Sequence, residues 1–381
     1  MKDRDDMTRV VIAADSFKGS ATSTEVNQYL AAGVKRAAPD AEVQTAAIAD
    51  GGAGTVKAVI DAVGGQLMTT SVLGPLGKNV DAQWGMLDDH TAIIEVAAAV
   101  GLTLVGETLV PVSSSTYGVG ELISAAMDQG ATTIYVGLGD SASTDGGAGM
   151  LVALGAGLID NNQQKLDLGG GSLMRLGHVS FRGLDERLKH TTLIGLTDVT
   201  NPLTGPEGAA AVFGPQKGAQ HEMIARLNQG LARLRTFVPM PDGLAASRQP
   251  GAGAAGGTGF GLLALGGQLK PGAKTVQTLT KLDDQLATAD FVITGEGRAD
   301  SQSLTGKAPI AVANLAQARH LPVALVAGSV QGSLAKIQAT GVHDVIVSTP
   351  EGMTVADAMA QTPDLLTQAG AKAMLTYLAE H

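Results

Sequence analysis

The sequence places hydroxyl, carboxylate and lysine side chains among glycines, directly after short apolar runs. The clearest case is VGLGDSASTDGGAGM, residues 136–150, which follows the run TTIYV. Glycine lets a backbone approach a ligand closely, and hydroxyls such as that of Ser141 can donate hydrogen bonds to an anion. Asp140 and Asp145 would repel a bare anion, so they would cap a helix, bind a cation or take a proton. We interpret this stretch as an anion-binding turn centred on Gly139, with a purely structural glycine turn as the alternative.

The segment AADSFKGS, residues 13–20, resembles that turn in its chemistry. It places Asp15, Ser16 and Lys18 just beyond the end of a predicted first strand, where open α/β sheets bind ligands. Lys18 would supply the positive charge of an anion clamp. The alternative is that Ser20 or Ser23 only caps the next helix.

A glycine loop and a strand end supply further candidates. ADGGAGT, residues 49–55, offers Gly51 and Gly52 at a helix start, which suits a phosphate or carboxylate and is equally typical of a tight turn. In LTDVTNPLTG, Asp198 is a hard oxygen ligand of the kind that Mg²⁺ takes together with substrate phosphates. An Asx turn before Pro202 is the competing interpretation.

The segment FGPQKGA places Lys217 at a predicted helix start. A lysine there opposes the helix dipole unless an anion is also present, so we expect Lys217 to serve a bound anion. The seven histidines have no spacing typical of a zinc site.

The densest polar stretch is VITGEGRADSQSLTGKAP, residues 292–309, which we expect to form the loop after a buried strand. Arg298 can hold a carboxylate through two hydrogen bonds, and Asp300 can orient or deprotonate a hydroxyl group. A structural network of salt bridges is the alternative. The candidates for substrate binding in this stretch are Glu296, Arg298, Gln302 and Lys307.

Composition excludes several classes of protein. The chain has 381 residues, enough for two domains, and it has no cysteine, hence no disulfide framework or thiolate metal site. A net charge of −10 with 3% aromatic residues argues against nucleic-acid binding, and no apolar run reaches the ~18 residues of a membrane span. We expect a cytoplasmic protein with small-molecule ligands.

The elements that must position these side chains alternate in type along the chain. Short β-branched runs such as RVVIAA and VQTAAIA alternate with helical stretches such as residues 24–37, and the same alternation returns at the other end of the chain, which is typical of a parallel α/β sheet. Three strands in close succession, GQLMTTSVLGP, DAQWGML and TAIIEVA, follow from residue 65 and predict an antiparallel or mixed sheet. We therefore predict a Rossmann-like domain from residues 1–70 and 285–381, with an inserted mixed α/β domain at residues 71–284. A cleft between the two domains is the expected ligand site.

Nine segments occur in the order seen in the bacterial type I glycerate kinase family, and the chain resembles that family from about residue 10 to beyond residue 330. An ordered series of this length is more specific than any one glycine loop. The segments are IAADSFKGS, ADGGAGT, GPLGKNVDAQWG, STYGVGELI, GLGDSASTDGGAGM, DVTNPLTG, FGPQKGA, PGAGAAGG and VITGEGRADSQSLTGKAP.

The resemblance implies ATP-dependent phosphorylation of D-glycerate with Mg²⁺, at the 2-hydroxyl, giving 2-phosphoglycerate and ADP. A glycerate 3-kinase, a kinase for a related small sugar acid and a non-catalytic sugar-acid sensor are the alternatives, and a homodimer is left open. The implied catalytic residues are Lys18, Asp198, which would also hold Mg²⁺, and Asp300. The implied nucleotide or phosphate contacts are Ser16, Gly51, Gly52, Gly139, Ser141, Asp145 and Lys217, and glycerate would bind at Arg298 with Glu296, Gln302 and Lys307.

The sequence departs from the family pattern at a few positions. The family usually has proline where this chain has Ala14, and glutamate where it has Ala53. It usually reads G-G-S-A-T-N-D-G-G where this chain has Asp140, Ser143 and Thr144. Negative charge is therefore lost at one candidate loop and gained at another, which predicts either a compensation between them or a changed acceptor.

Overall fold

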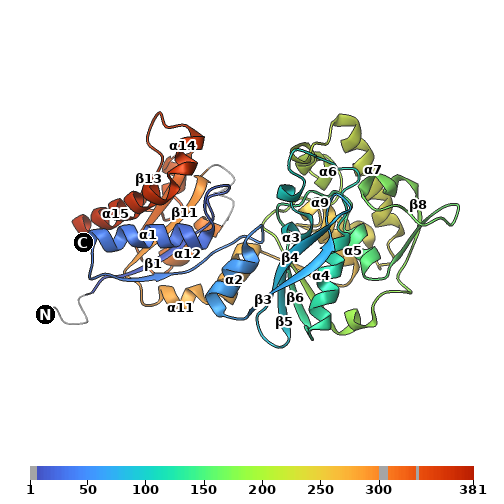
Figure 1. Ribbon diagram of the computed structural model, residues 1–381, viewed down its shortest axis with the longest axis horizontal. Coiled ribbons are helices and arrows are strands. Elements are labelled where there is room, and N and C mark those ends of the chain that lie inside the picture. Colours follow the sequence, from blue (N-terminus) through green and yellow to red (C-terminus); the bar gives the residue numbers. More distant parts are fainter. Residues whose placement is uncertain (1–6, 300–307, 332–333) are drawn as a thin grey trace. The chain divides into compact units, whose positions relative to one another are not determined.

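The computed structural model describes residues 7–299, 308–331 and 334–381 (Figure 1). Its helices and strands confirm the predicted α/β class, with one parallel and one mixed sheet. Two compact units divide the chain. The first takes in Met1–Asp50, Asp61–Val63 and Ala273–His381, and the second takes in Gly51–Ile60 and Gly64–Gly272.

A five-stranded parallel sheet forms the centre of the first unit, in the order β13-β12-β11-β1-β2. Alternate residues of β1 enter two different cores: Val10 and Ile12 pack on one side of the sheet, and Val11 and Ala13 on the other. A strand buried on both faces reads as a continuous apolar run, which is why RVVIAA predicted it. The strands are β1 (Arg9–Ala14), β2 (Glu42–Thr45), β11 (Phe291–Ala299), β12 (Val323–Val330) and β13 (Asp344–Val347).

Helices cover both faces of this sheet. On one face α1 (Ser23–Ala37) lies along α15 (Thr362–Glu380), as Figure 1 shows, and an added Cβ at Gly33 would lie 2.0 Å from the Thr367 carbonyl oxygen, so only glycine allows this approach. The other face carries α11 (Leu282–Leu286) and α12 (Ala308–Gln317). The remaining helices of this part of the chain are α10 (Gly272–Leu279), α13 (Leu334–Gln338) and α14 (Val355–Ala360).

The strand order of the parallel sheet reverses between β1 and β11. The chain passes from β1 to β2 on one side, and from β11 through β12 to β13 on the other. Open α/β sheets bind ligands beyond the carboxyl ends of the strands that flank such a reversal. The residues that follow β1, and the last residues of β11, therefore occupy the position where a ligand is expected in this unit.

The second unit is built on a six-stranded mixed sheet in the order β10-β9-β6-β5-β4-β3. As predicted, the three closely spaced strands pair antiparallel, whereas β5, β6, β9 and β10 are parallel, so their carboxyl ends share one edge. The strands are β3 (Gln66–Leu73), β4 (Asn79–Met86), β5 (Thr91–Glu95), β6 (Thr133–Gly137), β9 (Thr192–Leu196) and β10 (Gln268–Lys270). A separate two-stranded sheet pairs β7 (Gly157–Asp160) with β8 (Leu176–Ser180).

The helices of the second unit close two apolar cores, one centred on Trp84 and Leu122 and the other on Leu231 and Phe260. None of the described helices has the length and the apolar character that crossing a membrane requires. The helices are α2 (Thr55–Val63), α3 (Val96–Val100), α4 (Tyr117–Asp128), α5 (Ala148–Ala153), α6 (Ala209–Phe213), α7 (His221–Phe237), α8 (Gly243–Arg248) and α9 (Ala254–Ala264). Short 3₁₀ turns are η2 (Leu102–Leu104), η3 (Gly170–Arg175), η4 (Glu186–His190) and η5 (Pro215–Lys217).

Candidate functional site

Asp15 lies at the carboxyl end of β1, at the reversal of strand order in the first unit. Its backbone N–H donates to the carbonyl of Gly295 on β11, at 2.8 Å, and its Oδ1 accepts from the N–H of Ser16 at 2.6 Å. The first bond fixes the residue to the neighbouring strand, and the second fixes its side chain. The carboxyl group is therefore held in place at the edge where a ligand is expected.

Burial, together with the charges of Asp50 and Glu296, raises the pKa of Asp15 to about 7, against the opposing effects of the Ser16 N–H and Lys18. Removal from water and like charges both disfavour the ionised carboxylate. A carboxyl group that ionises near neutral pH can accept a proton at the pH of the cell. The sequence analysis placed Asp15 in the candidate ligand loop but gave it no catalytic role, because its neighbour Asp50 is 35 positions away along the chain and Glu296 is on a different strand.

Glu296 and Arg298 lie within β11, so the prediction that they follow the strand in a loop is wrong. The strand runs on to Ala299, and the two residues pair with Ala327 and Ser329 of β12. Glu296 is buried and Arg298 is exposed. Pairing with β12 continues β11 past the glycines of VITGEG, so the strand extends beyond its apolar run. Asp300, Gln302 and Lys307 lie outside the described residues.

Ser16 is partly exposed and Lys18 is exposed in the loop after β1. Neither Ser20 nor Ser23 caps α1: Thr22 does, in a capping box with Glu25. Ser23 instead donates to the Ala14 carbonyl at 2.6 Å and accepts from the Ile48 N–H. Helix capping therefore does not account for the presence of Ser16 and Lys18 in this loop.

In the second unit the predicted phosphate loop, residues 51–55, holds carboxylates of the protein itself. Asp140 accepts from the N–H of Ala53 at 3.1 Å, and Glu95 accepts from those of Gly54 at 3.2 Å and Val56 at 3.1 Å. These N–H groups belong to the start of α2, where the helix dipole favours negative charge.

Glycines in this region allow backbones to meet. An added Cβ at Gly51 would lie 2.6 Å from the Leu196 carbonyl oxygen, and one at Gly139 would lie 2.5 Å from the Cα of Gly52. The loop before α2, the end of β9 and the turn after β6 thus touch through their main chains. These contacts explain the glycine pattern as close packing of three segments at one sheet edge.

Glu95, the last residue of β5, is a residue that the sequence analysis missed. Burial raises its pKa, with three backbone N–H groups opposing that effect and the charge of Asp140 adding to it. The run TAIIEVA gave a signal, since a carboxylate at the end of an apolar strand needs hydrogen-bond donors there. The identity of those donors depends on the position of α2, which the sequence does not give.

Asp145 is fully buried and serves as the anchor of the turn after β6. Its carboxylate accepts from the N–H and hydroxyl of Thr116, and from the N–H groups of Gly147 and Gly149 at 3.1 Å each. Of the three roles open to it from sequence, these bonds are closest to that of a helix cap, because Gly147 immediately precedes α5 and Gly149 lies in its first turn, although Asp145 is not itself the N-cap residue. Burial nevertheless raises its pKa, since desolvation exceeds the effect of the donors.

Lys217 is buried beneath the same turn, with 2% of its surface exposed. Its Nζ donates to Ser141 Oγ at 2.9 Å and to the Ser143 carbonyl at 2.5 Å. It ends the 3₁₀ turn η5 and precedes α7 by four positions, so the prediction that it lies in the first turn of a helix is wrong. Burial lowers the pKa of Lys217 to about 7, against the charge of Asp145, which raises it.

Two hydroxyls of the turn are buried without a hydrogen-bond partner among the described residues. They are Ser143 Oγ and Thr144 Oγ1, and both side chains are fully buried. Such groups are uncommon in native proteins and call for an explanation at each occurrence. In a turn that already carries a lysine amino group, they are consistent with the anion-binding interpretation.

Asp198 follows β9 at the shared carboxyl edge of the second sheet, and its Oδ1 accepts from the N–H of Gly272 at 2.9 Å. The residue is partly exposed. In the described part of the chain no three His, Cys, Asp or Glu side chains gather into a group that could hold a metal ion. One carboxylate suffices where the phosphates of a substrate supply other ligands, so Asp198 fits an Mg²⁺ ion that arrives with a nucleotide.

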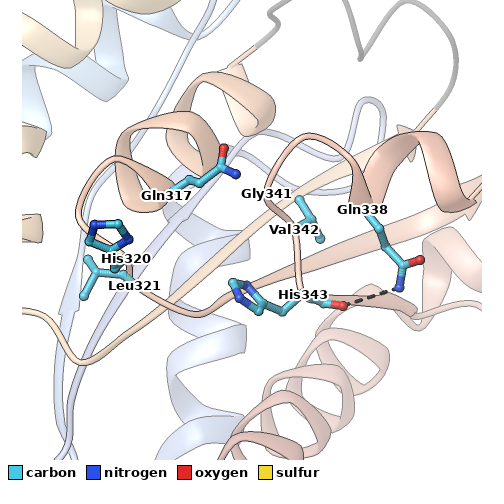
Figure 2. Close-up of a pocket in the computed structure, with 7 residues that line it drawn as sticks. All are labelled: Gln317, His320, Leu321, Gln338, Gly341, Val342 and His343. Carbon is cyan, nitrogen blue, oxygen red and sulfur yellow. Dashed lines mark hydrogen bonds between the residues drawn. The ribbon is translucent and has the colours of Figure 1, made fainter.

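Figure 2 shows a cavity of about 330 Å³ at the opposite edge of the parallel sheet, where β12 and β13 begin. None of the candidate residues lines it. His343 accepts at Nδ1 from the Val323 N–H, and its carbonyl accepts from Gln338, so its position has a structural explanation. The cavity lining consists of Gln317, His320, Leu321, Gln338, Gly341, Val342 and His343.

Comparison with known proteins gives one consistent result. The family model described as "Glycerate kinase family" matches residues 10–378. Glycerate 2-kinase of Escherichia coli K12 is 45% identical over 340 residues, covering 88% of this chain and 89% of the relative, and glycerate kinase of Bacillus subtilis is 42% identical over 353 residues, covering 92% of each. A crystal structure from Salmonella typhimurium LT2, provisionally named glycerate kinase 2, superposes with a TM-score of 0.84 at 40% identity, over 98% of this chain and 99% of that one.

Proposed function

The chain belongs to the glycerate kinase family and is a kinase, and we propose that it transfers a phosphoryl group from ATP to the 2-hydroxyl of D-glycerate. The bond between the acceptor oxygen and the γ-phosphorus forms, the bond to the β-phosphate oxygen breaks, and the products are 2-phosphoglycerate and ADP. The 2-position is supported by the 45% identity to a protein named glycerate 2-kinase, over 88% of this chain.

The observation on which the chemistry rests is the carboxyl group of Asp15, whose pKa is about 7. Phosphoryl transfer needs little covalent help from a protein, but the acceptor hydroxyl must lose a proton, and kinases use a carboxylate for this step. We assign this step to Asp15, at the strand-order reversal of the first unit. Lys18 and Arg298 supply positive charge at the same edge of that sheet, for a phosphate and for the glycerate carboxylate.

The other candidate residues take the following proposed roles. Ser16 and the turn around Gly139, with Ser141, Asp145 and Lys217, serve the phosphates. The N–H groups after Gly51 and Gly52 already bind carboxylates, so we assign that loop the role of positioning the Gly139 turn. Glu296 and, outside the described residues, Asp300, Gln302 and Lys307 complete the glycerate side.

Mg²⁺ would be held by Asp198 together with nucleotide phosphates. When bound, it neutralises charge on the phosphates and orients them for in-line transfer. The Gly272 N–H already orients the side chain of Asp198, so one of its oxygens is held at the sheet edge where the ion would bind.

We place the protein in the cytoplasm, with D-glycerate and ATP as its small-molecule partners. The net charge of the chain and its lack of cysteine are in keeping with this part of the proposal.

A ³¹P NMR time course with ATP, Mg²⁺ and D-glycerate tests the reaction directly, because the two phosphoglycerates give separate signals. We expect a 2-phosphoglycerate signal to grow as ATP is consumed. A 3-phosphoglycerate signal would overturn the proposed position of transfer. Stable ATP alongside detectable binding of D-glycerate would overturn catalysis itself.

The role of Asp15 has its own test in the pH dependence of kcat, measured at saturating MgATP and D-glycerate so that changes in binding do not enter. We expect the wild-type value to rise with pH through about 7, and Asp15→Asn to lower kcat by about 10²- to 10⁴-fold. Asp50→Asn is the matched control: it removes a charge that raises the Asp15 pKa, so the rising limb should move to lower pH. A limb that stays in place in Asp50→Asn, or survives in Asp15→Asn, would show that another group accepts the proton.

A further inference from the structure

Lys217 makes a set of contacts that a surface lysine does not make. One amino group bonds a side-chain oxygen, Ser141 Oγ, and a main-chain oxygen, that of Ser143, which lie two residues apart in the same turn. The lysine reaches them from a distant part of the chain, 76 and 74 positions along the sequence. It therefore joins η5 to the turn after β6 at the place where that turn bends.

A buried ammonium group is costly unless charge or hydrogen bonds compensate for it. Among the described residues the charge that acts on Lys217 is that of Asp145, and α6, which packs against η5, carries no charged residue. The carboxylate of Asp145 is itself bonded to Thr116, Gly147 and Gly149. The lysine is therefore only partly balanced from within the protein, and an anion bound on the turn would supply the remainder.

We propose that Lys217 is the positioning residue of the Gly139 turn: its amino group holds Ser141 and Ser143 in the arrangement that binds an anionic ligand, and its positive charge strengthens that binding from beneath. This inference rests on the proposed function for the identity of the anion, which is ATP or D-glycerate. The residue touches the turn and not the ligand, because its amino group is enclosed by turn atoms.

The charge of Lys217 gives the proposal a signature that a purely structural role lacks. Since its pKa is about 7, the amino group is mostly charged at pH 6 and mostly neutral at pH 8.5. The neutral amine keeps its hydrogen-bonding capacity and loses only its charge. Anion binding should therefore weaken as pH rises through 7, and the weakening should require Lys217.

The first test measures coupling in the ligand-free protein. In a ¹H–¹⁵N spectrum, the amide signals of Ala142 and Thr144 should titrate with a midpoint near pH 7 in the wild type, and this titration should be absent in Lys217→Met. Ser141→Ala is the matched control: it removes one of the two acceptors and leaves the lysine, so the midpoint should remain visible at Thr144. Because this experiment needs neither turnover nor ligand, it separates failure of the inference from failure of the proposed function.

The second test measures the dissociation constants of MgATP and of D-glycerate by calorimetry at pH 6 and pH 8.5. For at least one of these ligands, the dissociation constant of Lys217→Met should be about 10-fold higher than that of the wild type at pH 6. At pH 8.5 the two dissociation constants should agree within about 2-fold. An equal loss at both pH values would show a purely structural lysine, and no loss at either would remove Lys217 from the site. If Lys217→Met does not fold, wild-type amide signals that fail to titrate near pH 7 would by themselves overturn the inference.

Discussion

The side chain of Asp140 accepts a hydrogen bond of 3.1 Å from the backbone N–H of Ala53. These are two of the positions at which the sequence departs from the family pattern, with aspartate in place of glycine and alanine in place of glutamate. The carboxylate that the family pattern has at position 53 is absent here, and the carboxylate of Asp140 instead reaches the main chain of Ala53. The two departures compensate each other in space, and the acceptor need not have changed on their account.

This compensation predicts coupling between the two positions. Ala53→Glu alone brings a second carboxylate beside Asp140 and should lower the free energy of unfolding, whereas the same change with Asp140→Gly should be tolerated. A double-mutant cycle by chemical denaturation should give an interaction energy of about 1 kcal/mol, within the range for residues in contact. Strictly additive effects would contradict the compensation.

Asp140 also adopts a left-handed backbone conformation, with φ of 52°. Asp140→Ala removes the hydrogen bond and keeps that conformation, so it should lower the free energy of unfolding by about 1–2 kcal/mol. Asp140→Gly removes both the bond and the strain, and should be more stable than the alanine variant. Denaturation midpoints of the two variants check this order, and an alanine variant as stable as the glycine variant would refute it.

Lys217 should make the free energy of unfolding depend on pH in the alkaline range. Its pKa is about 7 in the folded protein and near 10.5 when unfolded, so between these values the unfolded chain binds the additional proton. The stability of the wild type should therefore rise with pH from 7 towards 10.5 relative to Lys217→Met, by at most about 1.4 kcal/mol per pH unit. Denaturation curves at several pH values give the difference, and parallel curves for the two proteins would mean that the pKa is not lowered.

Asp15 should have the opposite effect in the acidic range. Its pKa is raised from 3.8 to about 7, so between these values the folded protein holds a proton that the unfolded chain has released. The free energy of unfolding of the wild type should fall between pH 4 and pH 7 relative to Asp15→Asn. A wild type that gains stability relative to the variant over this interval would contradict the raised pKa.

Asp198→Asn tests the proposed Mg²⁺ ligand with little structural disturbance. The asparagine oxygen can still accept from the Gly272 N–H, so the melting temperature should change little, while one negative charge is lost. We expect the Mg²⁺ concentration for half-maximal rate to rise about 10-fold or more, with Thr191→Ala, at the amino end of β9, as a control. An unchanged Mg²⁺ requirement would exclude Asp198 as the ligand.

Local patterns predicted much of the fold and less of the site. Continuous apolar runs identified β1, and the helix expected over residues 24–37 corresponds to α1, since these signals lie within one segment. The run VQTAAIA predicted a longer second strand than β2, which ends at Thr45 because pairing with β1 stops there. Likewise β11 extends beyond its apolar run because β12 continues beside it.

The candidate residues could be recognised in the sequence by their residue types, but their hydrogen-bond partners could not. Nothing near Lys217 in the sequence indicates that it reaches Ser141, and nothing near Asp140 indicates Ala53. These pairings depend on how distant strands order in the sheet, which the sequence pattern leaves open. The same holds for the carboxyl cluster of Asp15, whose members come from separate elements.

The pairing of β1 with β11 joins residues that are 281 positions apart, as between Val10 and Phe291. During synthesis on the ribosome, β1 therefore emerges long before β11 exists, whereas the second unit is complete once Gly272 has been made. Domains generally fold as units as the chain emerges, and distant contacts form slowly. The middle of this protein should thus fold first, while the edge of β1 that receives β11 waits unpaired, and this interval is when the nascent chain most needs protection from aggregation.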